Sequence, residues 1–359
     1  MKYPIGIQDF RKLREGGYVY VDKTAGIYEV ITQGVYNLFY RPFGFGKSLM
    51  MSTIKELYSG NRELFRGLWI EEQWDWEQMQ RPVILLKFAD FNYQNKDIKT
   101  AIRGGIEEIS RDLGIDASQS SFFYLLSDLV EATYKKYGKK VVLLVDDYDK
   151  PIIDHLDEPE LAEANQAAIL ELFSFVKDSG PYFEMVFLTG TTFLNRNNVF
   201  SSSLNNLLDL SFSKNAHHLI GFTQRELEHY FEKSLEGEDK ENVRRWYNGY
   251  SWGQKETLYN PSSILRFFES GRVYRSFWSE RKLPSPLIKE MGKRRLDEHV
   301  PFEVTQMMLS AFEITQLDPI PLLFQTGCLT IAKYNSDDFL YTLDYPNEDV
   351  QQAIKQSLI

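Results

Sequence analysis

Residues 35–58 of the chain read VYNLFYRPFGFGKSLMMSTIKELY. The first six residues are mostly apolar and predict a buried strand. A loop punctuated by glycines follows, and then a stretch in which apolar residues recur at helical spacing: Leu49, Met50, Ile54 and Leu57. A strand, a glycine-containing loop and a helix in this order are typical of loops that bind phosphate groups in α/β proteins.

The loop itself matches part of the pattern GxxxxGK(S/T), in which backbone N–H groups surround phosphates and the lysine neutralises them. Its last three residues, GKS, are intact, whereas Arg41 stands where the first glycine is expected. The start of the following helix would supply unpaired N–H groups and a positive dipole end. We therefore predict a nucleotide-binding set of Gly44, Phe45, Gly46, Lys47, Ser48 and Leu49. A turn with an exposed lysine and a capping serine is the alternative.

A second strand, residues 141–145 (VVLLV), is unbroken, branched and followed by the acidic string DDYDK. Buried parallel strands have this composition. A phosphate loop needs a partner that holds Mg²⁺ and orients the attacking water. We predict that Asp146 binds Mg²⁺ together with the Ser48 hydroxyl and that Asp147 is the catalytic acid beside the water. A solvated turn after a buried strand would also explain the acidic string.

Short apolar runs alternate with amphipathic stretches, which is typical of parallel strands joined by helices and predicts an α/β fold. Strands are predicted at residues 35–40, 83–88, 141–145, 185–188 and 218–220, and helices at residues 102–113, 122–137 and 161–177. The strand at 185–188 leads into Thr189, which we predict to contact the terminal phosphate or its water as a second catalytic residue. A threonine that only caps its strand is the alternative.

The sequence changes character after the last of these strands. Thr223 is the expected N-cap of an amphipathic helix, and aromatic and polar motifs follow. We therefore predict a nucleotide-binding domain at residues 1–220 and a second domain at residues 221–359. Residues 1–34 are predicted to form a flap over the base or ribose, although their aromatic residues could instead be packing. Residues 280–298 are rich in charge and proline and predict a loop.

The composition excludes several classes of protein. A net charge of -10 argues against a broad surface for non-specific nucleic-acid binding. The single cysteine, Cys328, excludes an internal disulfide and any multi-cysteine zinc site, which fits a reducing compartment. Neither a signal-peptide pattern nor an apolar run of membrane-spanning length is found, so we expect a soluble, cytoplasmic protein without a membrane partner.

The ordered motifs resemble the AAA-ATPase-like family of bacterial P-loop proteins, many of which carry a C-terminal nuclease-type domain of the PD-(D/E)xK class. The resemblance covers the chain almost from end to end. Matching segments include PIGIQDF (4–10), YVYVDKT (18–24), RPFGFGKSL (41–49), VVLLVDDYDKPI (141–152), FLTGTTF (187–193), GFTQRELEHYF (221–231), WYNGY (246–250), YNPSSIL (259–265), QTGCLTI (325–331) and LDYPNEDV (343–350).

The resemblance implies a P-loop NTPase parallel sheet of the additional-strand type, followed by a mostly helical, winged-helix-like C-terminal region. It also implies that Lys47 and Ser48 grip the phosphates and Mg²⁺, with Asp146 as the second ligand on the metal side. ATP is favoured over GTP, because guanine-binding proteins generally carry an NKxD element after a late strand. The similar string at residues 95–98 lacks the final acid and precedes the acidic strand.

Two departures from the family pattern bear on activity. The family loop usually reads RPRRFGKS, so Phe43 and Gly44 replace two arginines and remove positive charge beside the phosphates. The family usually has Glu where this chain has Asp147, whose side chain is one methylene shorter. Binding tolerates both changes better than hydrolysis does. Up to Ile359 we find no convincing D…ExK strand pair, so nuclease activity is not expected of this sequence.

Three functional hypotheses remain at this point. The first is an ATP–Mg²⁺-binding protein, a slow ATPase that couples its nucleotide state to a partner-binding C-terminal region. The second is a nucleotide-gated binding module without significant hydrolysis, and the third is an interaction scaffold with a vestigial loop. A protein or nucleic-acid partner would bind through residues 221–359. An oligomer could supply an arginine in trans, for which Arg272, Arg275 and Arg281 are available.

Overall fold

A computed structural model gives the fold and describes residues 1–116, 120–177, 179–193, 207–280, 283–295, 300–309, 314 and 318–358. The first part of the described chain is an α/β unit built on a sheet of five strands: β1 (Tyr36–Tyr40), β2 (Val83–Lys87), β3 (Val141–Asp146), β4 (Phe183–Gly190) and β5 (Leu208–Asp209). Their order in the sheet is β2-β3-β4-β1-β5, and every neighbouring pair is parallel.

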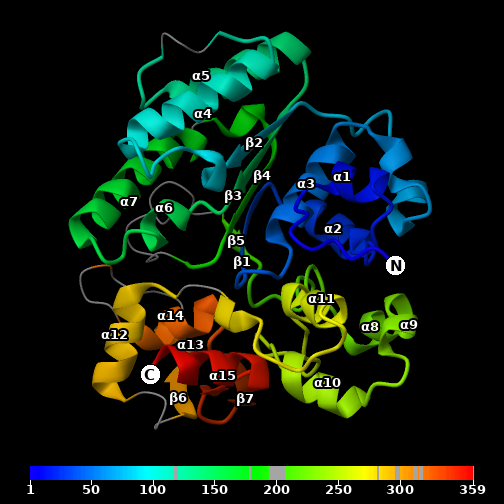
Figure 1. Cartoon of the computed structure of the whole chain (residues 1–359). Coiled ribbons are helices and arrows are strands. Elements are labelled where there is room, and N and C mark those ends of the chain that lie inside the picture. The colour runs from blue at the N-terminus through cyan, green and yellow to red at the C-terminus, as the bar shows by residue number, and fades with distance from the viewer. Residues whose placement is uncertain are drawn as a thin grey trace.

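Helices cover both faces of this sheet (Figure 1). One face carries α1 (Phe10–Glu15), α2 (Thr24–Ile31) and α3 (Lys47–Tyr58), and the other carries α4 (Ile98–Asp112), α5 (Leu125–Tyr137), α6 (Lys150–Ile153) and α7 (Pro159–Phe173). All six residues of β3 are buried as a result. Burial on both faces explains why this strand is a continuous run of apolar, mostly branched residues.

The strand order decides where the motifs meet. β4 lies between β1, which precedes the glycine-containing loop, and β3, which ends at Asp146. An additional strand between these two was expected from the family resemblance. Because parallel strands end at the same edge of a sheet, the loop after β1, the acidic string after β3 and Thr189 in β4 are brought together. Ligands of open α/β sheets bind at this edge.

The described part of the chain after residue 220 is mostly helical, with one small sheet. Its helices are α8 (Gln224–Tyr230), α9 (Glu232–Leu235), α10 (Lys240–Tyr247), α11 (Pro261–Glu269), α12 (Ser285–Arg294), α13 (Gln306–Leu309), α14 (Pro319–Thr326) and α15 (Glu348–Ser357). The antiparallel sheet has the order β6-β8-β7, formed by β6 (Phe302–Thr305), β7 (Thr330–Asn335) and β8 (Leu340–Asp344). A winged-helix architecture for this region stays a prediction.

The C-terminal region packs below the large sheet in the view of Figure 1. One cluster of buried apolar residues joins the two parts, since it contains strand residues such as Leu144 as well as Trp252 and Leu322. A second buried cluster contains both Val21 of the N-terminal segment and Leu227 of α8. The division at residue 220 stays a prediction, while the contacts across it are extensive.

Local signals in the sequence have mixed outcomes. Thr223 caps α8 as expected, because its side chain accepts a hydrogen bond from the N–H of Glu226 in a capping box. The strand expected at residues 218–220 is wrong, since these residues form turns, and the fifth strand is β5. The loop expected at residues 280–298 contains α12. Its proline lies in the first helical turn, where the missing N–H costs nothing.

Among the described residues, no helix combines the length and the apolar character needed to cross a bilayer.

Candidate functional site

Backbone donors remain unpaired in the second half of the loop between β1 and α3 and in the first turn of α3. Gly44 and Gly46 have φ angles of 83° and 103°, in the left-handed region that favours glycine. The six consecutive N–H groups from Gly44 to Leu49 donate no hydrogen bond to any residue that the structure describes. Unpaired N–H groups at the start of a helix attract anions, because the helix dipole adds positive potential there. The loop therefore has the character of an anion site.

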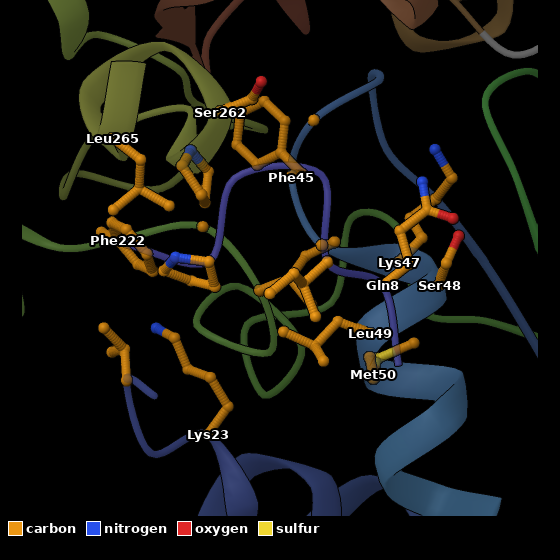
Figure 2. Close-up of a pocket in the computed structure, with 18 of the residues that line it drawn as sticks. Gln8, Lys23, Phe45, Lys47, Ser48, Leu49, Met50, Phe222, Ser262 and Leu265 are labelled. Carbon is orange, nitrogen blue, oxygen red and sulfur yellow. The ribbon is translucent and has the colours of Figure 1, made fainter. Parts of the chain in front are cut away.

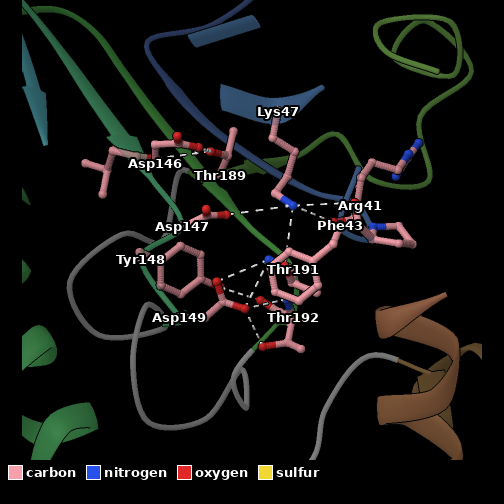
Figure 3. Close-up of polar contacts among 12 residues, drawn as sticks. Arg41, Phe43, Lys47, Asp146, Asp147, Tyr148, Asp149, Thr189, Thr191 and Thr192 are labelled. Atoms are coloured by element: carbon pink, nitrogen blue, oxygen red, sulfur yellow. Dashed lines mark hydrogen bonds and ion pairs between the residues drawn. The ribbon is translucent and has the colours of Figure 1, made fainter. Parts of the chain in front are cut away.

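Lys47 is buried inside this loop, with a side chain that is 5% exposed. Its ammonium donates a hydrogen bond to the Arg41 carbonyl oxygen at 2.9 Å and lies 3.4 Å from Oγ1 of Thr191 (Figure 3). Oδ1 of Asp147 is 3.8 Å away. The structure thus brings the predicted phosphate-binding lysine and the predicted acid together. Thr191 is an addition that the sequence reasoning did not single out.

Asp146, at the end of β3, is 3% exposed. Its Oδ1 accepts a hydrogen bond from Oγ1 of Thr189 at 2.8 Å. Burial and the neighbouring Asp147 raise the pKa of Asp146, and hydrogen bonds from Ser48 and Thr189 partly offset this rise. The predicted metal ligands, Ser48 and Asp146, therefore lie near one another. The Thr189 hydroxyl donates its hydrogen bond to Asp146, so the geometry favours a role for Thr189 in positioning this carboxylate. Contact between Thr189 and a phosphate stays a prediction.

Asp147 has an unusual backbone for a residue other than glycine, with a φ of 52°. Its side chain is 15% exposed and contributes to the lining of the cavity beside the loop. Within the described chain, Oδ1 accepts no hydrogen bond, and the Lys47 ammonium faces it. Left-handed backbone at a residue other than glycine is strained, and such residues cluster at functional sites, where the strain directs a side chain towards a ligand. Asp147 is the predicted acid that reaches the cavity.

Asp149 holds the chain that leaves β4 and is 1% exposed. Its carboxylate accepts hydrogen bonds from the N–H of Thr191 at 3.0 Å, the N–H of Thr192 at 2.6 Å and the Thr192 hydroxyl at 2.7 Å. Burial and the charge of Asp147 raise the pKa of Asp149 to about 6 despite these bonds. Asp149 holds the backbone of Thr191 in place, and the Thr191 hydroxyl is in turn a contact of the Lys47 ammonium. The strings DDYD and GTT contain these residues, but neither string shows that they meet.

The side chain of Phe45 lies against the C-terminal region, so only the backbone of Phe45 is available to an anion in the loop. Its ring centroid is 4.9 Å from that of Tyr250 and 5.4 Å from that of Trp252, both in edge contacts. The carbonyl oxygen of Gly44 accepts a hydrogen bond from the N–H of Ser262 at 3.2 Å. The loop and the start of α11 are thus directly bonded.

A cavity of about 260 Å³ opens beside the loop. Figure 2 shows Lys47 and Ser48 at one end of it and Lys23, Phe222 and Leu265 at the other. Every predicted nucleotide-binding residue from Gly44 to Leu49 contributes to the lining. Residues 4–8, 19–21 and 23 of the predicted flap segment also line it, and their role as a flap stays a prediction. Asp146 and Thr189 are not lining residues.

In the part of the chain that the structure describes, no group of three or more His, Cys, Asp or Glu side chains could hold a metal ion.

Comparisons with known proteins agree with the geometry. A family model described as "Predicted AAA-ATPase" matches residues 4–200. The chain belongs to this AAA-ATPase-like family. A protein described as "Uncharacterized protein in vnfD 5'region", from Azotobacter chroococcum mcd 1, is 36% identical over 364 residues, which cover 100% of this chain and 70% of that protein. Membership of the AAA-ATPase-like family supports nucleotide binding, while the matched range ends before α11.

Proposed function

We propose that the chain binds ATP together with Mg²⁺ at the loop from Gly44 to Leu49 and hydrolyses it slowly. The observation that carries this proposal is the run of six unpaired N–H groups next to the buried Lys47 ammonium. A polyphosphate has enough oxygens to satisfy these donors. A plain turn between a strand and a helix gives no reason to bury a lysine at the sheet edge where two carboxylates also end.

The proposed roles follow from the contacts. The Lys47 ammonium exchanges the Arg41 carbonyl oxygen for phosphate oxygens, which carry full charge and attract it more strongly. The loop N–H groups orient the phosphates. Asp147 accepts a hydrogen bond from the attacking water, because its carboxylate reaches the cavity. Thr189 holds the Asp146 carboxylate in place.

The donor set fits Mg²⁺. This ion usually binds to one or two carboxylates together with substrate phosphates, and a cage of protein ligands alone is uncommon. Asp146 and Ser48 supply one carboxylate and one hydroxyl near each other, which suits an ion shared with the phosphates. When bound, Mg²⁺ would supply neutralisation of the negative charge that develops on the phosphate oxygens.

Slow hydrolysis is proposed because Asp147 is one methylene shorter than the Glu common in the family. The same observation favours the alternative, a nucleotide-gated binding module without significant hydrolysis. Phosphate release from the wild type and from Asp147→Glu separates them. Higher turnover in Asp147→Glu supports a slow ATPase, whereas no turnover in either protein supports the binding module.

Coupling to the C-terminal region is part of the proposal. Three carbonyl oxygens of the loop accept hydrogen bonds from that region: Phe43 from the Asn260 amide at 3.0 Å, Gly44 from the Ser262 N–H at 3.2 Å, and Phe45 from the Gly221 N–H at 3.2 Å. A loop that adjusts to phosphates would pull on these bonds. The start of α11 would then move with the nucleotide state.

Calorimetric titration of ATP–Mg²⁺ tests the core of the proposal. We expect the wild type to bind and Lys47→Ala to lose about 100-fold in affinity, since a charge-assisted contact is worth about 3 kcal/mol. Lys55→Ala is the matched control, because Lys55 lies exposed on the same helix. Absence of binding heat in the wild type would contradict the proposal and leave an interaction scaffold.

A protein or nucleic-acid partner is proposed for residues 221–359. A gel shift of the full chain with duplex DNA at physiological salt distinguishes the two, since a shift that modest salt removes counts against specific DNA binding. An arginine supplied in trans by an oligomer stays a prediction. Arg272 donates to the Glu236 carbonyl oxygen at 2.7 Å, Arg275 pairs with Glu280 at 3.3 Å, and Arg281 lies outside the described residues.

A further inference from the structure

The chain that leaves β4 is held from two sides. On one side, the Asp149 carboxylate accepts hydrogen bonds from the backbone N–H groups of Thr191 and Thr192. On the other side, the N–H of Phe193 donates to Oε1 of Gln325 at 3.0 Å. Gln325 belongs to α14, which lies in the C-terminal region below the large sheet in the view of Figure 1. This segment therefore connects the acidic string after β3 to the C-terminal region.

The side-chain amide of Gln325 is buried and bonded at both of its polar atoms. Gln325 is 1% exposed, and its Nε2 donates to the carbonyl oxygen of Leu309 in α13 at 2.9 Å. The partners determine how the amide is oriented, because the Phe193 N–H can only donate and the Leu309 carbonyl oxygen can only accept. A buried polar group that loses its partner is costly, so this amide resists displacement. Gln325 therefore holds the Phe193 backbone in place relative to α13.

The end of α14 also packs against the start of the nucleotide loop. Gly327 caps this helix with a φ of 86°, in the left-handed region. A Cβ atom at Gly327 would lie 2.8 Å from the Cβ and Cγ atoms of Pro42, so the two residues approach each other closely. Pro42 follows Arg41, whose carbonyl oxygen accepts the hydrogen bond from Lys47. The motif QTG at residues 325–327 thus contacts both the segment after β4 and the loop.

Thr191 is the residue of this segment that reaches the site. Its Oγ1 lies 3.4 Å from the Lys47 ammonium (Figure 3), and Thr191 is 1% exposed. In phosphate loops of this kind the lysine reaches the β- and γ-phosphates. A threonine hydroxyl beside that lysine can donate a hydrogen bond to a phosphate oxygen. The place of this hydroxyl depends on the backbone bonds that Asp149 and Gln325 make on either side of it.

We propose that Gln325 is a positioning residue of the nucleotide site and holds Thr191 where its hydroxyl contacts the terminal phosphate of ATP. This inference rests on the proposed function, because it requires a triphosphate at Lys47. ADP lacks the terminal phosphate, so Gln325 contributes to the binding of ATP and not to that of ADP. The C-terminal region thereby completes the part of the site that distinguishes the two nucleotides. Gln325 lies outside residues 4–200, the range of the family match.

Calorimetric titration with ATP–Mg²⁺ and with ADP–Mg²⁺ tests this role. Gln325→Leu removes both hydrogen bonds of the amide and should lower the affinity for ATP by about three- to tenfold, while the affinity for ADP changes by less than about twofold. Thr326→Val is the matched control on the same helix, because Thr326 is buried and its hydroxyl donates to the Leu322 carbonyl oxygen within α14. This variant should keep the wild-type preference for ATP.

A double-mutant cycle separates positioning from general destabilisation. Thr191→Val removes the hydroxyl itself and should lower the preference for ATP at least as much as Gln325→Leu does. If Gln325 acts through Thr191, the variant with both changes should lose no more than Thr191→Val alone, because no hydroxyl is left to position. Two losses that multiply would show that Gln325 acts by another route, and would overturn the inference.

Hydrogen exchange of the unmodified protein gives a readout that does not depend on a variant's folding. ATP–Mg²⁺ should protect the N–H groups of Thr192 and Phe193 more than ADP–Mg²⁺ does, because the contact of Thr191 with the terminal phosphate stabilises the segment. Equal protection by the two nucleotides, or an unchanged preference for ATP in Gln325→Leu, would overturn the role of Gln325 and leave the phosphate site intact. A wild type that binds neither nucleotide would overturn the proposed function, and this inference with it.

Discussion

The Lys47 ammonium and the Asp147 carboxylate lie 3.8 Å apart, with side chains that are only 5% and 15% exposed. The lysine also donates to the Arg41 carbonyl oxygen at 2.9 Å, so its charge is shared between its own loop and the acidic string after β3. In the proposed complex, the Lys47 ammonium pairs with phosphate oxygens. The Asp147 carboxylate then faces these negatively charged oxygens. This carboxylate should oppose binding while it assists hydrolysis.

Asp147→Asn separates these two effects. Removal of the negative charge should raise ATP–Mg²⁺ affinity by about three- to tenfold, because a repulsive contact at the cavity is lost. Phosphate release should fall by at least about 100-fold, the usual contribution of a residue that accepts a proton from water. Calorimetry and a phosphate-release assay measure the two. Asp157→Asn, at an exposed position, is the control, and weaker binding by Asp147→Asn would contradict the assignment.

The Thr189 hydroxyl should act through Asp146. Thr189→Val removes the 2.8 Å hydrogen bond to Oδ1 and leaves the carboxylate free to turn, so more Mg²⁺ should be needed for half-maximal ATP binding, by about three- to tenfold. Binding of ATP without Mg²⁺ should not change. Thr133→Val is a matched control, because Thr133 is equally buried and its hydroxyl donates to the Leu129 carbonyl oxygen of α5. An unchanged Mg²⁺ requirement would show that Thr189 has another role.

Much of the fold can be predicted from the sequence because the deciding signals are local. β1, the glycine-containing loop and α3 follow one another, and β3 is a continuous apolar run that ends in carboxylates. β5 cannot be recognised in the sequence, because a strand of two residues leaves no periodic pattern. The prolines of residues 280–298 favour a loop, although a proline in the first turn, as in α12, is compatible with a helix.

The site was predictable only in part, for a related reason. Lys47, Ser48, Asp146 and Asp147 can be named as candidates from the sequence because each belongs to a short motif at the end of a strand, and their roles stay predictions. The contacts of the loop with Asn260 and Trp252 join residues more than 200 positions apart, and no local pattern encodes them. The same reason explains why the sequence does not predict that the Phe45 ring is buried against the C-terminal region.

His217 should make the folded state sensitive to mild acid. Its side chain is 3% exposed, and burial together with His218 and Arg41 lowers its pKa from 6.5 to about 4. As the pH falls, His217 takes up a proton in the unfolded chain before it does so in the folded protein. The contribution of neutral His217 to the free energy of unfolding is therefore fully present above about pH 6.5 and is lost as the pH falls towards 4. The slope is at most about 1.4 kcal/mol for each pH unit. Urea unfolding at several pH values should show a flatter dependence for His217→Gln.

The control for this measurement is His229→Gln, because His229 is exposed on α8. This variant should keep the pH dependence of the wild type. A His217→Gln variant with the wild-type slope would show that other groups cause the loss of stability in acid.

Asn260 connects the nucleotide loop to α11. One substitution at this position can remove its hydrogen bond to the loop and keep its cap on the helix. Its Oδ1 caps α11 by accepting a hydrogen bond from the Ser262 N–H at 3.0 Å, and its amide donates to the Phe43 carbonyl oxygen at 3.0 Å. Asn260→Asp keeps the cap, since aspartate is an equally good N-cap. The same change replaces the donor with a charged oxygen opposite the Phe43 carbonyl, which should displace the loop and lower ATP–Mg²⁺ affinity by about tenfold.

Asn347 offers a matched control with the same design elsewhere in the C-terminal region. It caps α15 through the Val350 N–H at 3.1 Å, and its amide donates to the Asn248 carbonyl oxygen at 2.6 Å. Asn347→Asp should lower the free energy of unfolding by about 1–3 kcal/mol, as Asn260→Asp does, because each variant leaves a carbonyl oxygen without its donor. It should bind ATP normally, since it does not contact the loop. If both variants lose affinity equally, the loss reflects general destabilisation, and Asn260 does not transmit the state of the loop.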